Sequence, residues 1–108
     1  MNFRPARVGK LIRTELAKII LREVEFGDAL VTITAVTVDK NLEHASVSVS
    51  VIPSAKTAAA LRALGATTGR LQHLLMKKIN IKPMPRISFA VDHGMENAAS
   101  VERMLLHE

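Results

Sequence analysis

The stretch that decides the fold is residues 31–51, VTITAVTVDKNLEHASVSVSV. From residue 45 to 51, Ala and Val alternate with Ser, which is the pattern of a strand with one buried and one wet face. Residues 31–39 are rich in β-branched side chains. Their alternating apolar residues stand at odd positions up to Ile33 and at even positions from Val36, so a β-bulge is expected near Ala35. Only the five residues 40–44, which are mostly polar, separate the two stretches, so these are expected to pair as antiparallel strands.

A helix is predicted before this strand pair, over residues 5–24. Pro5 is tolerated in a first helical turn, and Gly27 with Asp28 ends the pattern. Apolar side chains return every three to four positions and leave the opposite side cationic. The apolar arc holds Val8, Ile12, Leu16, Ile19 and Ile20, and the cationic arc holds Arg4, Arg7, Lys10, Lys18 and Arg22.

After the strand pair, two helices with a short break between them are expected. Ser54 is placed to cap the first of them, which ends near Gly65. Thr67 or Thr68 is placed to cap the next, which runs to about residue 78 with Leu71, Leu75 and Ile79 inside and Arg70, His73 and Lys77 outside. Residues 82–85 then interrupt the chain before a strand over 86–91, and residues 98–107 have the pattern of a last amphipathic helix.

Length and charge favour one globular domain, residues 1–108, with a polyanionic partner. The 108 residues are 48% hydrophobic and 23% charged, and no repeat or linker divides them. Fifteen Lys and Arg against ten Asp and Glu give a net charge of +5. Between Glu43 and Asp92 there is no acidic residue, although seven basic residues lie there. The alternative interpretation is a solvated basic surface that keeps the protein soluble.

Several classes of function find no support in the sequence. There is no Cys, which removes thiolate metal sites and disulfides and agrees with a cytoplasmic protein, and no apolar run is long enough to span a membrane. The four histidines are scattered, and no acid/base pair or phosphate-binding loop is recognisable. No catalytic residue, metal or cofactor is therefore expected, and an unrecognised small hydrolase stays a minor alternative.

The expected order of helix, two strands, two helices and strand is that of a type II KH domain. In such domains a GxxG loop between the two middle helices lets a nucleic-acid backbone approach closely. Here Gly65 and Gly69 are one residue too far apart for that motif, and a plain helix cap is the alternative. With only three Phe and no Tyr or Trp, any RNA would be held by its phosphates and shape rather than by stacking.

Three separated blocks of the chain, from Arg4 to Leu106, resemble the ribosome-binding factor A family. The first resembles the opening helix of that family, and the second its strand pair with an Asp-x-x-Leu-x-x-Ala connection, here Asp39, Leu42 and Ala45. The third is similar to its closing strand and terminal helix, including Pro85, Phe89, Asp92, Glu96 and Leu105. The blocks read RPARVGKLIRTELAKIILREV, LVTITAVTVDKNLEHASVSVSV and MPRISFAVDHGMENAASVERMLL.

The resemblance implies an α+β, type II KH-like domain in the order α-β-β-α-kink-α-β, with a three-stranded sheet and a short C-terminal helix. The family's Ala-x-Gly kink is represented by Thr67, Thr68 and Gly69. Functionally it implies binding to the immature 30S subunit and its 16S rRNA, help in maturing the rRNA 5′ end, a role in cold adaptation, and no catalysis. We expect a monomer when free; a generic KH-like RNA-binding or RNA-chaperone module is the alternative.

The RNA-binding surface is expected on the third predicted helix, the segment after it and the first turns of the opening helix. Gly69 is expected either to supply a special backbone conformation or to permit close approach of another chain. The predicted RNA-binding residues are Arg4, Arg7, Lys10, Arg70, Lys77, Lys78, Lys82 and Arg86.

Overall fold

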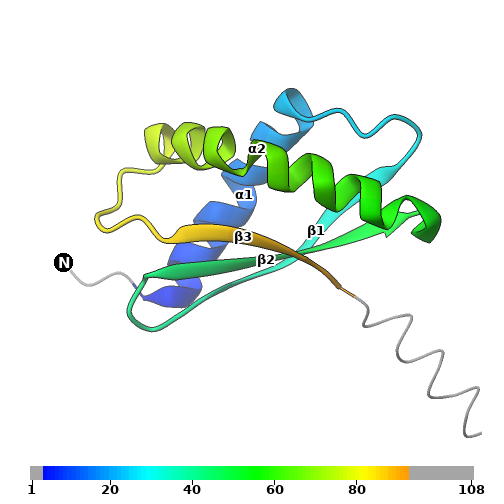
Figure 1. The fold of residues 1–108 in the computed structure, drawn as a ribbon. Helices are drawn as coiled ribbons and strands as arrows, with labels where there is room; N and C mark the ends of the chain where they lie inside the picture. The colour runs from blue at the N-terminus through cyan, green and yellow to red at the C-terminus, as the bar shows by residue number, and fades with distance from the viewer. Residues whose placement is uncertain (1–3, 93–108) are drawn as a thin grey trace, which may run out of the picture.

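Two α-helices and three strands make up residues 4–92, the part of the chain that the computed structural model describes (Figure 1). The elements are α1 (Pro5–Glu23), β1 (Leu30–Val38), β2 (His44–Ile52), a 3-10 turn η1 (Ser54–Lys56), α2 (Thr57–Lys78) and β3 (Arg86–Val91). The predicted opening helix and all three predicted strands are confirmed. The helix expected over 98–107 lies outside the described residues.

The strand pair has the predicted direction and the predicted bulge. β1 pairs with β2 antiparallel, and its register shifts between Ile33, opposite Val49, and Ala35, opposite Ser48. Thr34 is the extra residue, and its hydroxyl donates a hydrogen bond of 3.2 Å to the carbonyl oxygen of Ser48. The bulge explains the change of apolar parity, because it moves the buried positions of β1 onto the other set of alternate residues.

The sheet is mixed, in the order β1-β2-β3, because β3 pairs with β2 in parallel. The crossover between them is α2, which packs on β3, while α1 packs on β1 and the two helices contact each other. The alternating apolar residues of β2 are buried beneath the helices, and Ser46 on its other face is exposed. The largest core side chains are Ile12, Leu16 and Ile19 of α1, Val47 and Val49 of β2, and Leu64, Leu71 and Leu75 of α2.

The loop of the β1–β2 hairpin is organised by Asp39. Its carboxylate accepts hydrogen bonds from the backbone N–H of Glu43 at 2.7 Å and of His44 at 3.3 Å. These bonds, the one from Glu43 first, hold the pKa of Asp39 below its ordinary value. Leu42, at φ 57°, packs its partly buried side chain against the core, and Ala45 is fully buried. The three residues of the Asp-x-x-Leu-x-x-Ala pattern thus stabilise the hairpin, Asp39 by hydrogen bonds and Leu42 and Ala45 by packing in or against the core.

The predicted break in the middle of the chain is wrong, because α2 is one continuous helix of 22 residues. Neither Thr67 nor Thr68 begins a helix: their hydroxyls donate to carbonyl oxygens one turn back, to Ala63 at 2.7 Å and to Leu64 at 2.8 Å. Such back-bonds bend helices, and the ribbon of α2 changes direction near its middle (Figure 1). The sequence at the kink therefore produces a bend without interrupting the helix.

The cap expected at Ser54 is also absent. Ser54 begins the 3-10 turn η1, and Lys56, the residue before α2, makes no side-chain capping hydrogen bond. The helix thus starts later than predicted, at Thr57.

Candidate nucleic-acid interface

Four segments lie toward one end of the molecule: the start of α1, the β1–β2 hairpin loop, the end of α2 and the start of β3 (Figure 1). The backbone N–H of Arg86 donates to the carbonyl oxygen of Glu43 at 2.9 Å, which joins β3 to the hairpin loop. Gly9 brings α1 close to β1, since a Cβ there would lie 3.0 Å from the carbonyl oxygen of Val36. We call this region the basic end; its predicted RNA-binding residues are Arg4, Arg7, Lys10, Lys77, Lys78, Lys82 and Arg86.

The cations of the basic end are all exposed. Within residues 4–92 none of the seven forms an ion pair. Among the described acids, Asp39 and Glu43 belong to the hairpin loop, and the carboxylate of Asp39 accepts hydrogen bonds from backbone N–H groups and lies 3.3 Å from Nδ1 of His44. Seven of the eight predicted residues, from three separate parts of the sequence, therefore lie on segments at the same end of the molecule and are exposed to solvent.

Gln72 holds the connection between α2 and β3 in place. Its side-chain amide donates to the carbonyl oxygen of Pro85 at 2.9 Å and accepts from the backbone N–H of Ile87 at 2.8 Å. The amide thus fixes the backbone on both sides of Arg86, next to the segment that carries Lys82. Sequence reasoning missed Gln72, because its partners lie 13 and 15 residues away, beyond a Pro-rich turn.

Arg70 is the one predicted residue that lies apart from the basic end. Its Nε donates to a carboxylate oxygen of Glu23 at 2.7 Å, which links the middle of α2 to the last residue of α1. The bond from Arg70, with a longer one of 3.3 Å from Arg22, lowers the pKa of Glu23. Arg70 therefore has an acidic partner, whereas the seven residues of the basic end form no ion pair within the described part of the chain.

The two glycines of α2 face solvent on its outer side. Both are exposed, and an added Cβ at Gly65 or Gly69 would meet no atom within 4 Å. Among the described glycines only Gly27 has a positive φ, 61°, so the special backbone conformation expected at Gly69 is wrong. The fold requires glycine at neither helical position, which leaves close approach of a partner as the role to test.

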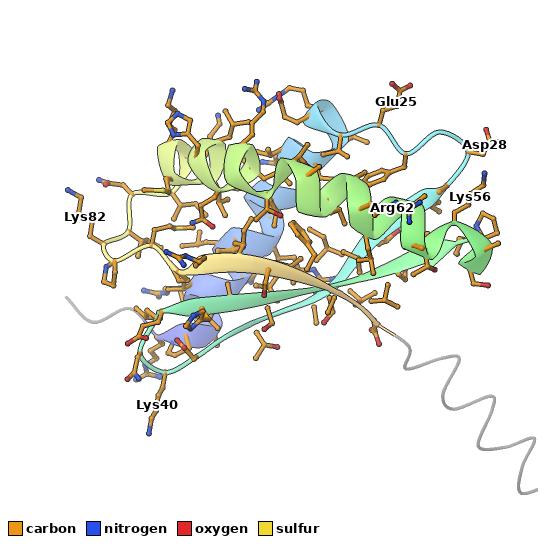
Figure 2. The ribbon with its side chains drawn as sticks, in the orientation of Figure 1. Glu25, Asp28, Lys40, Lys56, Arg62 and Lys82 are labelled. Carbon is orange, nitrogen blue, oxygen red and sulfur yellow. The ribbon has the colours of Figure 1, made fainter. Side chains whose placement is uncertain are left out.

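The opposite end of the molecule has mixed charge. Figure 2 shows Lys82 and Lys40 at the basic end, and Lys56 and Arg62 toward the other, where Glu25 and Asp28 also lie. A cavity of about 310 Å³ lies there between the loop of residues 25–29 and the first turns of α2, with Glu25, Asp28 and Lys56 in its lining. Glu25 and Asp28, which precede β1 in the sequence, thus lie at the same end as Lys56 and Arg62. These two cations belong to the part of the sequence that has no acidic residue.

Residues 4–92 contain no group of three His, Asp or Glu placed to hold a metal ion. In the same range, neither helix has the length and apolar character needed to cross a membrane.

Comparison with known proteins gives one consistent family. The sequence profile of ribosome-binding factor A matches residues 4–105. Ribosome-binding factor A of Thermomicrobium roseum is 33% identical over 106 residues, covering 96% of this chain and 82% of the relative. That of Opitutus terrae is 32% identical over 106 residues, covering 97% of this chain and 87% of the relative.

Solved structures agree with the sequence relatives. The crystal structure of ribosome-binding factor A from Thermus thermophilus superposes with a TM-score of 0.70 at 26% identity, covering 82% of this chain and 97% of that one. A homology model of the Thermus thermophilus factor, fitted into a cryo-EM map of a 30S-RbfA complex, has the same fold, with a TM-score of 0.58 at 24% identity and coverage of 76% and 92%. By sequence and by fold, the chain belongs to the ribosome-binding factor A family.

Proposed function

We propose that this protein binds the immature 30S ribosomal subunit through its 16S rRNA and assists late maturation of the subunit, including processing of the rRNA 5′ end. It does so as a monomeric, non-catalytic factor in the cytoplasm, and it leaves when the subunit is complete. Membership of the family supports this proposal. The observation that carries it is the basic end, where seven cations are exposed to solvent and form no ion pair within residues 4–92.

The grip on RNA is electrostatic. Phe26 and Phe89 are half-buried and pack against the core, and neither belongs to the segments that form the basic end, so no stacking platform accompanies its cations within residues 4–92. Lys and Arg at the basic end neutralise phosphates and release counterions, which requires no base-specific contact. If about five phosphates are contacted, the logarithm of the association constant should fall against the logarithm of salt with a slope of roughly −3.5 to −4.5.

The outer side of α2 extends the contact surface away from the basic end. At Gly65 and Gly69 no side chain stands between a partner and the helix backbone, so a sugar-phosphate chain can lie closer there than over any other residue type. Helical glycine costs up to about 1 kcal/mol relative to Ala. Since the fold gains nothing from these glycines, a contact with the partner explains why the helix carries them.

Sedimentation of cell extract through a sucrose gradient tests the proposal. We expect the protein in the free 30S fractions and not in 70S ribosomes, and we expect cells that lack it to accumulate 16S rRNA with an unprocessed 5′ end, most strongly in the cold. Absence from all ribosomal fractions would contradict the proposal. Equal affinity of the purified protein for 30S subunits and for an unrelated structured RNA would favour the generic KH-like module instead.

A further inference from the structure

The outer edge of β1 is open. β1 is the first strand in the order β1-β2-β3, and within the described residues only β2 pairs with it. An open edge presents backbone N–H and C=O groups to any extended chain, and proteins usually protect it with charged residues, Pro or a bulge. β1 contains neither a charged residue nor Pro, and its bulge lies at Thr34, which leaves the segment from Leu30 to Ile33 regular.

An apolar groove accompanies this regular segment. Between α1 and β1 lies a cavity of about 300 Å³ with a mainly apolar lining. Two large apolar side chains of this lining remain mostly in solvent, Leu21 of α1 at 86% exposed and Leu30 of β1 at 62%. The other apolar lining residues are Ala17, Ile20, Val24, Phe26, Ala29, Val31 and Ile33.

The groove has a direction, because α1 is close to β1 at one end only. At Gly9 the helix approaches the carbonyl oxygen of Val36, whereas farther along the two elements separate around the cavity. A second hollow, of about 500 Å³, lies on the Gly9 side and includes Lys10 and Ala35 in its lining. Arg13 lines both hollows, so the groove is apolar beside Leu30 and cationic toward Ala35.

We propose that this groove binds an extended segment of a protein partner, which adds to the sheet as a strand beside β1. The apolar side chains of that segment pack beside Leu21 and Leu30, and a carboxylate of the same segment pairs with Arg13. An RNA strand fits this surface poorly, since its phosphates would face mainly apolar side chains and it lacks the backbone amides that complete a strand edge. The surface is also distinct from α2, which packs at the β3 side of the sheet.

Two fluorescein-labelled, end-blocked peptides of equal composition and opposite polarity, ETVTITV and VTITVTE, serve as probes. We expect one of them to bind the purified protein in fluorescence anisotropy, since only one polarity brings its acid to Arg13 with its apolar residues beside Leu30. An antiparallel strand would select the first peptide and a parallel strand the second. Hydrogen exchange should slow at backbone amides of β1 in that complex. Binding of neither peptide, or no protection in β1, overturns the proposal.

Variants separate this site from non-specific binding. Leu21→Asp and Arg13→Glu each change an exposed side chain and should weaken the selected peptide at least roughly tenfold. The Arg13→Glu protein should regain affinity for the same peptide with Lys in place of Glu. Met76→Asp, which alters a 53% exposed apolar residue on α2, is the matched control and should bind as the wild type does. Equal losses in Leu21→Asp and Met76→Asp would refute the site.

Two further outcomes would assign the groove to another occupant. A dimer in sedimentation equilibrium that Leu21→Asp abolishes would give the surface to a second copy of this chain. Displacement of the peptide by an RNA oligonucleotide in low salt, with Arg13→Glu protein losing RNA affinity in parallel, would give it to RNA. Either result overturns the proposal of a protein segment.

Discussion

The two ends of the molecule differ in what surrounds their cations. At the basic end Lys77 and Lys82 have no acidic partner within residues 4–92, whereas Lys56 at the opposite end shares a cavity lining with Glu25 and Asp28. All three lysines belong to the same acid-free part of the sequence. The difference arises because the fold returns residues 25–28 to the start of α2. The net charge of the sequence therefore predicts that the partner is negatively charged. The tertiary fold determines which basic residues lie beside acidic ones and which do not.

Charge reversal at each end is the strongest test of this difference. Lys77→Glu/Lys82→Glu should reduce 30S affinity roughly tenfold or more and reduce the magnitude of the salt slope by about 1.5 to 2, because two phosphate contacts are lost. Lys56→Glu/Arg62→Glu changes the net charge equally, at two exposed cations of the opposite end, and should have a much smaller effect. Filter binding or sedimentation with purified 30S subunits gives both numbers.

Equal losses in the two double variants, with both proteins folded, would show that the basic end is no localised site. Every lysine would then contribute slightly to a general attraction. Circular dichroism melting of each variant distinguishes this result from unfolding.

Loss of Gln72 should loosen the basic end from within. In Gln72→Ala the carbonyl oxygen of Pro85 and the N–H of Ile87 lose part-buried partners, which costs about 1–3 kcal/mol of unfolding free energy. Urea denaturation measures that cost. His73→Ala, at the exposed neighbouring position, is the control and should change little. An unchanged urea midpoint in Gln72→Ala would show that β3 is positioned by strand pairing alone.

The glycines of α2 allow stability and binding to be separated. Gly69→Ala should raise the unfolding free energy by up to about 1 kcal/mol, because Ala is the better helix former and its Cβ meets nothing. The same change should weaken 30S binding if RNA lies against the helix there. Gly65→Ala, one turn farther from the basic end, should give a similar gain in stability and a smaller loss of affinity. A more stable Gly69→Ala protein with unchanged affinity would remove the glycine from the interface.

The smallest expected effect is the pH dependence of the Arg70–Glu23 pair, which lies between the two ends. The pKa of Glu23 is lowered in the folded protein, chiefly by Arg70, from an ordinary value of 4.5. Its contribution to stability is therefore present above pH 4.5 and is lost as the pH falls through the lowered pKa. Urea midpoints of wild type and Glu23→Gln should differ at pH 6 and converge as the solution is made more acidic. A difference that persists unchanged to the lowest pH would refute the ion pair.

Local patterns predicted α1, the three strands and a bulge near Ala35, which the structure has at Thr34, because each depends on periodicity within a few residues. They failed at Gly65 and Gly69, where weak helix formers predicted a break. Burial of Leu64 and Leu71, worth about 1.5–3 kcal/mol for each fully buried side chain, outweighs the glycine cost of about 1 kcal/mol each. Contacts between residues far apart in the sequence could not be predicted either. The spacing of residues gives no sign of the hydrogen bond from Gln72 to Pro85 or of the ion pair between Arg70 and Glu23.

The parallel pairing of β3 with β2 has a consequence for the order of folding. The β1–β2 hairpin closes a short loop and can form in microseconds, whereas β3 joins only after the whole of α2 has been placed across the sheet. During synthesis the hairpin and α2 leave the ribosome before β3 does, and β2 keeps a bare edge until β3 emerges. A nascent chain that stalls before Arg86 therefore exposes this edge to other chains, and β2 stays unprotected until β3 has been made.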